Sequence, residues 1–281
     1  MAEVVDLNGE YSSEEFEQAK ANILSRLTLS PVVMPSNSPQ AFLLGGQSGA
    51  GKTTLHGMIQ ERFGYNVIVV NGDGFRSYHP RYRELDKEYG PESVNYTAKW
   101  AGTMTEAVVE ALSTVGYNLA VEGTLRTAEV PTKTATLLKE RGYRVFLAVM
   151  AVKPEISLIS CQIRYEQMRI AGTVPRATDP DHHNLIIRQI VSNMRVLEQS
   201  DLFEGIYLVN RAKEVLYPKE GLEGKASDAL EQVLFGPWSR EESIHYDYLK
   251  QQYKELQGRA AKGVLPRGRS TLGRRSTSPR R

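Results

Sequence analysis

Cysteine is almost absent from this sequence, with Cys161 the only one in 281 residues. A single cysteine excludes an intrachain disulfide and any zinc site built from several cysteines. Because Cys161 follows Leu158 and Ile159 in a segment with helical spacing, we interpret it as a packed core residue. The pattern is typical of a protein from a reducing compartment.

Long hydrophobic runs are also missing. The most apolar stretch, VFLAVMAV at 145–152, is far shorter than the roughly 20 residues that a membrane-spanning helix needs. The first residues, MAEVVDLNGEYSSEEF, contain neither the basic start nor the apolar centre of a signal peptide. We therefore expect a soluble, cytoplasmic protein that has no membrane association.

The chain as a whole has little net charge, but its last residues carry a surplus of positive charge. The sequence has 35 Lys and Arg against 33 Asp and Glu, a net charge of +2. Eight of the basic residues and none of the acidic ones lie in 258–281, so residues 1–257 carry 27 basic and 33 acidic groups, a net charge of −6. An acidic body excludes a wholly basic nucleic-acid-binding domain.

The basic end of the chain has its own composition. Residues 258–281 are rich in Gly, Pro, Ser, Thr and Arg and show no apolar period, which predicts a disordered tail. A basic tail can bind nucleic acid, but we interpret this one as a solubilising appendage.

The rest of the sequence alternates between short apolar runs and segments with helical spacing. Residues 1–40 hold a predicted helix, which begins at the capping box Ser12–Glu15, and a linker with three prolines. From 41 to 257, five predicted strands and five predicted helices precede two terminal helices. We expect strands at 41–45, 67–70, 118–123, 144–152 and 205–210, and helices from about 51, at 91–115, 131–141, 155–168, 181–199, 226–235 and 239–256.

This alternation is typical of an α/β fold. Buried parallel strands appear as continuous apolar runs, and the helices between them cover both faces of the sheet. We therefore predict a domain over 41–257 with a mostly parallel central sheet flanked by helices and a C-terminal helical extension. Ligands of such folds bind at the carboxyl ends of the strands.

A phosphate-binding loop follows the first predicted strand. The sequence GQSGAGKT at 46–53 matches the pattern Gly-x4-Gly-Lys-Ser/Thr, in which backbone amides surround the phosphates. In this motif Lys52 reaches the β- and γ-phosphates and the Thr53 hydroxyl binds magnesium. We predict a P-loop NTPase-like domain that binds a nucleoside triphosphate with Mg²⁺. The predicted nucleotide-binding residues are Gly46, Gln47, Ser48, Gly49, Ala50, Gly51, Lys52, Thr53 and Thr54.

Polar residues follow two other predicted strands. Asp73, after the strand at 67–70, can take a proton from an acceptor hydroxyl or hold magnesium through water. The alternative is that NGDG is a turn, because Asn, Gly and Asp all favour turns. Glu122, Thr124 and Arg126 at the end of the strand at 118–123 suit a substrate rich in hydroxyls, or else cap the following helix.

Two arginines flank a segment that contains proline and glycine, and we interpret residues 164–180 as a lid. Arg164 and Arg176 can stabilise charge on a transferred phosphoryl group, and a lid keeps water from ATP. The alternative is that each is an ordinary surface residue. We expect no metal site at His182 and His183, because adjacent helical positions point about 100° apart.

Five ordered segments together resemble the zeta-toxin family, the kinase half of a bacterial toxin–antitoxin pair, and most closely its streptococcal chromosomal branch. The similarity extends from about residue 41 to 210, and more weakly to 238. The segments are LLGGQSGAGKTT (43–54), VNGDGFRSYHP (70–80), YNLAVEGTLRTAEVP (117–131), GYRVFLAVMAVKPE (142–155), and IRYEQM with PRATDPDHH (163–183).

The resemblance implies an ATP-dependent kinase that phosphorylates the 3′-hydroxyl of the amino sugar of UDP-N-acetylglucosamine and so blocks peptidoglycan precursor synthesis. It implies Asp73 as the general base, and Lys52, Arg164 and Arg176 as contacts of the ATP phosphates. It also implies an antitoxin protein that blocks the ATP site. The positions that match the sugar-nucleotide pocket are Glu106, Glu122, Thr124, Arg126 and Thr134.

The sequence departs from the family in the lid, where the segment between Arg164 and Arg176 is one residue shorter. Two other functions remain open. The protein is either a kinase for another small acceptor with a hydroxyl group, or a nucleotide-dependent switch without catalysis. A switch would keep Lys52 and Thr53 but would need neither a base at Asp73 nor the lid arginines.

Overall fold

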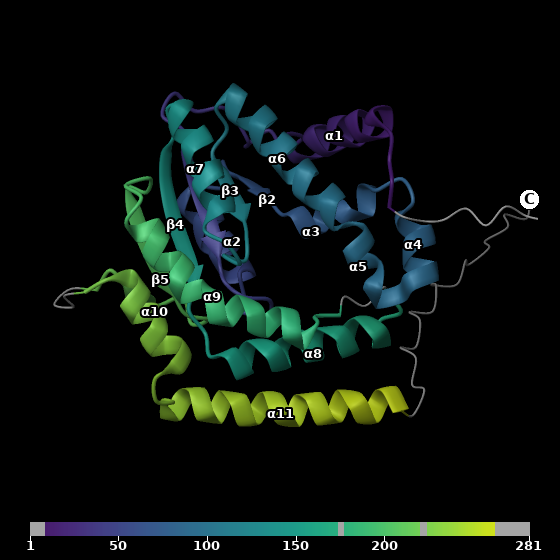
Figure 1. Cartoon of the computed structure of the whole chain (residues 1–281), viewed down its shortest axis with the longest axis vertical. Coiled ribbons are helices and arrows are strands. Elements are labelled where there is room, and N and C mark those ends of the chain that lie inside the picture. The colour runs from purple at the N-terminus through teal and green to yellow at the C-terminus, as the bar shows by residue number, and fades with distance from the viewer. Residues whose placement is uncertain (1–8, 174–176, 220–223, 262–281) are drawn as a thin grey trace, which may run out of the picture.

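The structure is a computed structural model that describes residues 9–173, 177–219 and 224–261 (Figure 1). Within these residues one six-stranded sheet has the order β2-β3-β1-β4-β5-β6. The first five strands pair in parallel, and β6 is antiparallel to β5. The strands are β1 Gln40–Gly45, β2 Ile68–Val70, β3 Leu119–Glu122, β4 Arg144–Met150, β5 Gly205–Val209 and β6 Val215–Tyr217. This confirms the predicted α/β fold with a mostly parallel sheet, and adds β6, which was not predicted because it is short and more exposed than the other strands.

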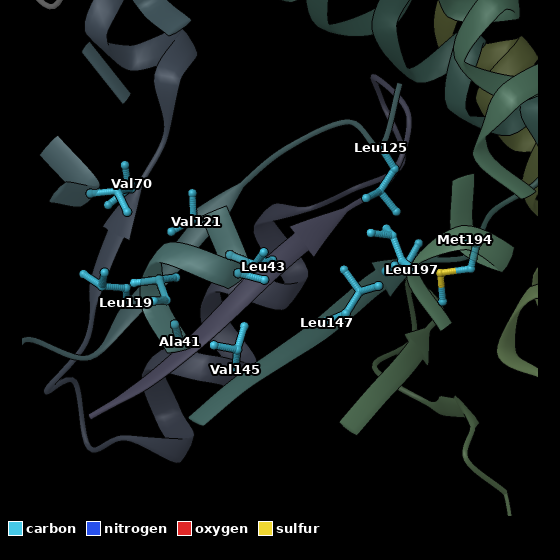
Figure 2. Close-up of a cluster of buried hydrophobic side chains, with 14 of the residues drawn as sticks. Ala41, Leu43, Val70, Leu119, Val121, Leu125, Val145, Leu147, Met194 and Leu197 are labelled. Carbon is cyan, nitrogen blue, oxygen red and sulfur yellow. The ribbon is translucent and has the colours of Figure 1, made fainter. Parts of the chain in front are cut away.

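Each face of the sheet has its own apolar core. Successive residues of a strand point to opposite faces, so Ala41 and Leu43 of β1 belong to one cluster, and Phe42 and Leu44 to the other. Figure 2 shows the first cluster, in which β1 and the neighbouring strands meet Met194 and Leu197 of a covering helix. Because both faces are buried, the central strands are continuously apolar, which is why they were predictable.

The helices divide between the two faces (Figure 1). Buried residues of α1, α6, α7, α9 and α10 contribute to the first cluster, and those of α2, α8 and α11 to the second. The long helices are α1 Ser13–Leu27, α2 Thr53–Arg62, α6 Ala98–Val115, α7 Glu129–Glu140, α8 Pro154–Ile170, α9 Pro180–Glu198, α10 Ala226–Phe235 and α11 Arg240–Ala261. Each lies in a segment predicted as helical, with ends that differ by a few residues.

The long helix predicted over 91–115 is wrong in its first part. The chain from β2 to α6 instead forms short helices, which are α3 Gly72–Phe75, η1 Arg76–Tyr78, α4 Tyr82–Tyr89, η2 Gly90–Glu92 and α5 Ser93–Tyr96. Thr97 separates α5 from α6 because its hydroxyl donates to the Ser93 carbonyl (3.1 Å), while Arg76 donates to the Val94 carbonyl (2.7 Å). The Arg76 bond occupies the Val94 carbonyl, which a continuous helix would bond to the amide four residues later.

The N-terminal helix α1 begins at the predicted capping box. The Glu15 amide donates to the Ser12 hydroxyl (3.1 Å), and the Ser12 amide donates to the Glu15 carboxylate (2.7 Å). Phe16 of α1 then packs edge-on against Trp100 of α6, with ring centroids 5.4 Å apart. The helix therefore lies on the core of the domain, next to the chain that carries Asp73.

The C-terminal helix α11 lies alongside α8 and buries Leu249 against it (Figure 1). It continues to Ala261, past Gly258, where the tail was expected to begin. Residues 262–281 lie outside the described part of the chain, and so does the expected disorder there. None of the described helices is both long and apolar enough to cross a membrane.

Candidate active site

The glycine-rich loop connects β1 to α2 at the carboxyl end of the parallel strands, which is the predicted position for a ligand. Gly46, Gly49 and Gly51 have φ angles of +134°, +76° and +97°, a region that favours glycine. At Gly49 a side chain is also excluded sterically, because a Cβ atom would lie 2.0 Å from the Ser157 carbonyl oxygen. The motif therefore has glycine at the three positions where the backbone of the loop adopts a positive φ angle.

Lys52 is held over this loop. Its ammonium group donates to the carbonyls of Gly46 (2.9 Å) and Gln47 (3.3 Å), and it lies 3.7 Å from Glu122 Oε1. Burial lowers the pKa of Lys52, while the negative charges of Glu122 and Asp73 raise it. The charges of these two carboxylates therefore act on the same ammonium group.

Side chains that are buried wholly or in part support the loop through hydrogen bonds. Gln47 is fully buried and donates to the Val152 carbonyl (2.9 Å) and to the Ser157 hydroxyl (3.2 Å). The same hydroxyl lies 2.9 Å from Nε2 of His183 on α9, and burial lowers the pKa of His183. Arg211, which follows β5, donates to the carbonyls of Gly49 and Ala50. The sequence gives no local signal for Ser157, His183 or Arg211, because they join the loop only through the fold.

Glu122, at the end of β3, connects the loop to the rest of the site. Its Oε2 lies 3.1 Å from Nε2 of His56, which is one turn after Lys52 on α2. Burial opposes the charge of Glu122, but the contacts with His56 and Lys52 outweigh it and hold the pKa of Glu122 below its usual value. His56 was missed in the sequence, although its position four residues after Lys52 puts both on one helical face.

Asp73 lies in the first turn of α3, where its amide donates to the Asn71 side chain (3.0 Å). Its carboxylate is exposed and accepts a hydrogen bond from Arg76 Nε (3.0 Å). The turn predicted for NGDG and a catalytic role for Asp73 are thus compatible, because the turn presents the carboxylate at the surface.

Glu106 lies on α6 beside the element that carries Asp73. Gly72 packs so closely on Thr105 that a Cβ atom would lie 2.5 Å from its hydroxyl oxygen. The Glu106 carboxylate is exposed and pairs with Lys133 of α7 (2.9 Å). Glu106 and Asp73 therefore lie on packed elements, and Lys133 is a further charge that the sequence did not indicate.

Thr124 and Arg126 lie in the loop from β3 to α7. Leu125 between them is buried, has a φ angle of +55°, and accepts a hydrogen bond from Asn193 of α9 (2.9 Å), so the loop is anchored while Arg126 is exposed. Thr134 lies farther along, on α7, where its hydroxyl donates to the Val130 carbonyl (3.0 Å). The loop residues are grouped with Glu122, whereas Thr134 is placed on the helix that follows.

Of the two predicted lid arginines, the structure describes Arg164 but not Arg176. Arg164 is exposed on α8, in the segment that was predicted as a helix. Burial has the largest effect on the pKa of Lys52 and lowers it, and the positive charge of Arg164 lowers it further. The two cations are therefore close enough to interact electrostatically. Arg176 is one of residues 174–176, which lie outside the described residues.

Oxygen ligands suited to magnesium are present near the loop. Thr53 is the first residue of α2 and is exposed, and Asp73 presents a carboxylate. Hydroxyl and carboxylate oxygens are the ligands that Mg²⁺ prefers, together with substrate phosphates. The chemistry of these side chains therefore fits the metal that this motif binds.

Comparison with known proteins identifies relatives along most of the chain. The model of the family described as Zeta toxin matches residues 25–221. Toxin PezT of Streptococcus pneumoniae is 47% identical over 248 residues, which cover 88% of this chain and 97% of the relative. Toxin zeta of Streptococcus pyogenes is 37% identical over 233 residues, 79% of each chain.

Solved structures agree with these matches. One from the PezAT chromosomal toxin–antitoxin system of Streptococcus pneumoniae superimposes with a TM-score of 0.80 at 43% identity, and the match covers 89% of this chain and 98% of the other. The AvrRxo1-ORF1:-ORF2 complex with ATP has a TM-score of 0.52 at 16% identity, over 92% of each chain. The second likeness shows the fold alone.

Proposed function

The chain belongs to the zeta-toxin family, and from this premise we propose that it is the kinase toxin of a toxin–antitoxin pair. Its reaction is transfer of the γ-phosphoryl group of ATP to the 3′-hydroxyl of the amino sugar of UDP-N-acetylglucosamine. The observation that carries the proposal is the position of Lys52, which is bound to the phosphate loop and lies 3.7 Å from Glu122 at the neighbouring strand end.

The nucleotide side of the site is the phosphate loop with residues 46–54. Its backbone amides and the start of α2 provide positive potential for phosphates. Lys52, Arg164 and Arg176 neutralise the charge of the transferred group. Magnesium, held by Thr53 and Asp73, would supply further neutralisation of the phosphate oxygens. A protein of the same fold was solved with ATP, which agrees with this role.

The acceptor side is formed by the residues around Asp73 and the end of β3. Asp73 takes the proton of the 3′-hydroxyl while the oxygen bonds to the γ-phosphorus and the bond to the ADP oxygen breaks. Arg76 orients the Asp73 carboxylate through its bond of 3.0 Å. The residues proposed to hold the sugar nucleotide are Glu106, Glu122, Thr124, Arg126 and Thr134.

A kinase of this kind must be restrained in the cell that makes it. We propose a cognate antitoxin protein that blocks the ATP site, as the PezAT relationship suggests. Co-expression with the neighbouring small gene tests this. Growth should stop without that gene and recover with it, whereas equal growth in both cases would contradict a toxin–antitoxin role.

The reaction is tested by incubating the purified full chain with ATP, Mg²⁺ and a panel of UDP-sugars, followed by mass spectrometry. The expected product is UDP-N-acetylglucosamine with one added phosphate. Transfer only to a different hydroxyl compound would identify a kinase for another small acceptor. Binding of ATP without transfer to any acceptor would identify a nucleotide-dependent switch.

A further inference from the structure

Arg211 lies directly behind the phosphate loop, although it is 161 residues from Ala50 in the sequence. It follows β5, and the sheet order places β5 beside β4, which is the neighbour of β1. The carboxyl ends of these parallel strands lie at one edge of the sheet. The turn after β5 is therefore brought to the loop that follows β1.

The side chain of Asn210 fixes this turn. Its Oδ1 accepts hydrogen bonds from the amides of Ala212 (2.9 Å) and Glu214 (3.0 Å), and its Nδ2 donates to the Glu214 carboxylate (2.6 Å). Such bonds from an Asn side chain to the following backbone are typical of a tight turn. The backbone of Arg211 is thus held in a defined turn, which fixes the position from which its side chain extends.

The Arg211 guanidinium bridges the loop and α8. Nε donates to the Ala50 carbonyl (3.2 Å), and Nη2 donates to the Gly49 carbonyl and to the Ser160 hydroxyl (2.9 Å). The group is partly buried, and burial lowers the pKa of Arg211. Hydrogen bonds from an ionised donor are about twice as strong as neutral ones, so these contacts restrain the loop strongly.

The contacts with two successive carbonyls determine where the loop amides point. In a trans peptide the C=O of one residue and the N–H of the next point in opposite directions. The Ala50 carbonyl points to Arg211, so the Gly51 amide points away from Arg211. The Ala50 amide is already bonded to the Gln47 carbonyl (3.1 Å). Arg211 therefore fixes two peptide planes that lie between Gly49 and Gly51, both of which have positive φ angles.

We propose that Arg211 is a positioning residue, which holds the phosphate loop in its ATP-binding conformation without itself touching a substrate. Glycine-rich segments lose much conformational entropy when they are ordered. A loop that is ordered before ATP arrives does not have to be ordered by ATP, so its affinity for ATP is higher. This inference rests on the proposed function only in that the loop binds ATP.

The test is a calorimetric titration of the full chain with ATP and Mg²⁺, for the wild type, Arg211→Ala and Arg211→Lys. Arg211→Ala should bind ATP about 10- to 100-fold more weakly, as expected for the loss of hydrogen bonds from a charged group. Arg211→Lys should lie between the two, because an ammonium group cannot bridge both carbonyls in the same plane. The matched control is Arg144→Ala, which removes an exposed arginine at the start of β4 and should bind ATP like the wild type.

Two further readouts separate positioning from a general loss of structure. In Arg211→Ala the KM for ATP should rise while the KM for UDP-N-acetylglucosamine is unchanged, and millimolar guanidinium chloride, but not sodium chloride, should restore ATP binding. Wild-type affinity of folded Arg211→Ala for ATP would overturn the inference. If Arg211→Ala does not fold, wild-type affinity of Arg211→Lys would overturn it. A wild type that binds no ATP would overturn the proposed function and the inference together, which distinguishes the two failures.

Discussion

The proposed nucleotide side and the proposed acceptor side of the site lie at the same edge of the sheet but are supported differently. The phosphate loop is held by the buried side chains of Gln47 and Ser157 and by the partly buried side chain of Arg211. Asp73 and Glu106 on the acceptor side are exposed and are paired with Arg76 and Lys133. Exposed ion pairs contribute only about 0–1 kcal/mol, so these two carboxylates are held less firmly than the phosphate loop.

This difference indicates a division of tasks. A preorganised loop suits phosphate groups, which are the same in every ATP-dependent reaction. Exposed side chains on separate helices suit recognition of a particular acceptor, because they can be rearranged around it. Glu122 belongs to both sides, since it contacts Lys52 and His56 and also ends the strand that leads to Thr124.

The largest expected effect comes from the acceptor side. Asp73→Asn removes the proposed base and should lower kcat by about 10²- to 10⁴-fold, while ATP binding, which depends on the loop, should be retained. Steady-state kinetics and calorimetry measure the two quantities. Phosphorylation of UDP-N-acetylglucosamine at nearly the wild-type rate would show that Asp73 is not the base.

A smaller effect is expected where the two sides meet. Glu122→Gln keeps the shape of the side chain but removes its charge, so it should lower kcat/KM for UDP-N-acetylglucosamine by about 10- to 100-fold, as for other hydrogen bonds to charged groups. The matched control is Glu110→Gln, because Glu110 is exposed and pairs with Arg141. Equal kcat/KM values for the two variants would show that Glu122 does not contribute to the reaction.

Acidification should weaken the supports of the loop. Burial lowers the pKa of His183 below its ordinary value of 6.5, so the unfolded chain takes up a proton between pH 6.5 and the folded pKa while the folded protein does not. Stability is therefore complete above about pH 6.5 and falls as the pH is lowered, by at most about 1.4 kcal/mol per pH unit for this group.

Thermal unfolding from neutral to acidic pH measures this loss. Burial also lowers the pKa values of His79 and His245. These two residues therefore add to the loss of stability in the wild type and in a His183 variant alike. His183→Gln keeps a polar group near Ser157 but does not titrate, and its Tm should fall less with pH than that of the wild type. Parallel curves would exclude His183 as a source of the pH dependence.

The smallest effect is expected from the tail. The basic residues beyond α11 take no part in the proposed chemistry, since the charges proposed to act on the phosphates are Lys52, Arg164 and Arg176. A chain truncated after Ala261 should therefore keep the wild-type kcat and both KM values. A large loss of transfer would show that the tail contributes to the site or to binding of the nucleotide sugar.

The sequence predicted the residues that follow one another in a motif better than those that meet only in the folded protein. The loop was predictable because its glycines, lysine and threonine lie within eight residues, and each is needed for a local backbone turn or for a contact with phosphate or magnesium. The central strands were predictable because burial on both faces leaves them continuously apolar. Arg211, His56 and Lys133 were not, because their contacts depend on how distant elements pack. The broken helix before α6 has the same cause, since the distant Arg76 donates to the Val94 carbonyl, which a continuous helix would use, and to the Thr97 hydroxyl.

The most direct test of the two-sided site is a titration of a matched pair of arginine variants with ATP and, separately, with UDP-N-acetylglucosamine. Arg211→Ala removes a support of the loop, and Arg126→Ala removes an exposed arginine of the acceptor side. We predict that Arg211→Ala weakens binding of ATP alone and that Arg126→Ala weakens binding of UDP-N-acetylglucosamine alone. If each variant weakened binding of both ligands to the same extent, the division of the site into a nucleotide side and an acceptor side would be contradicted.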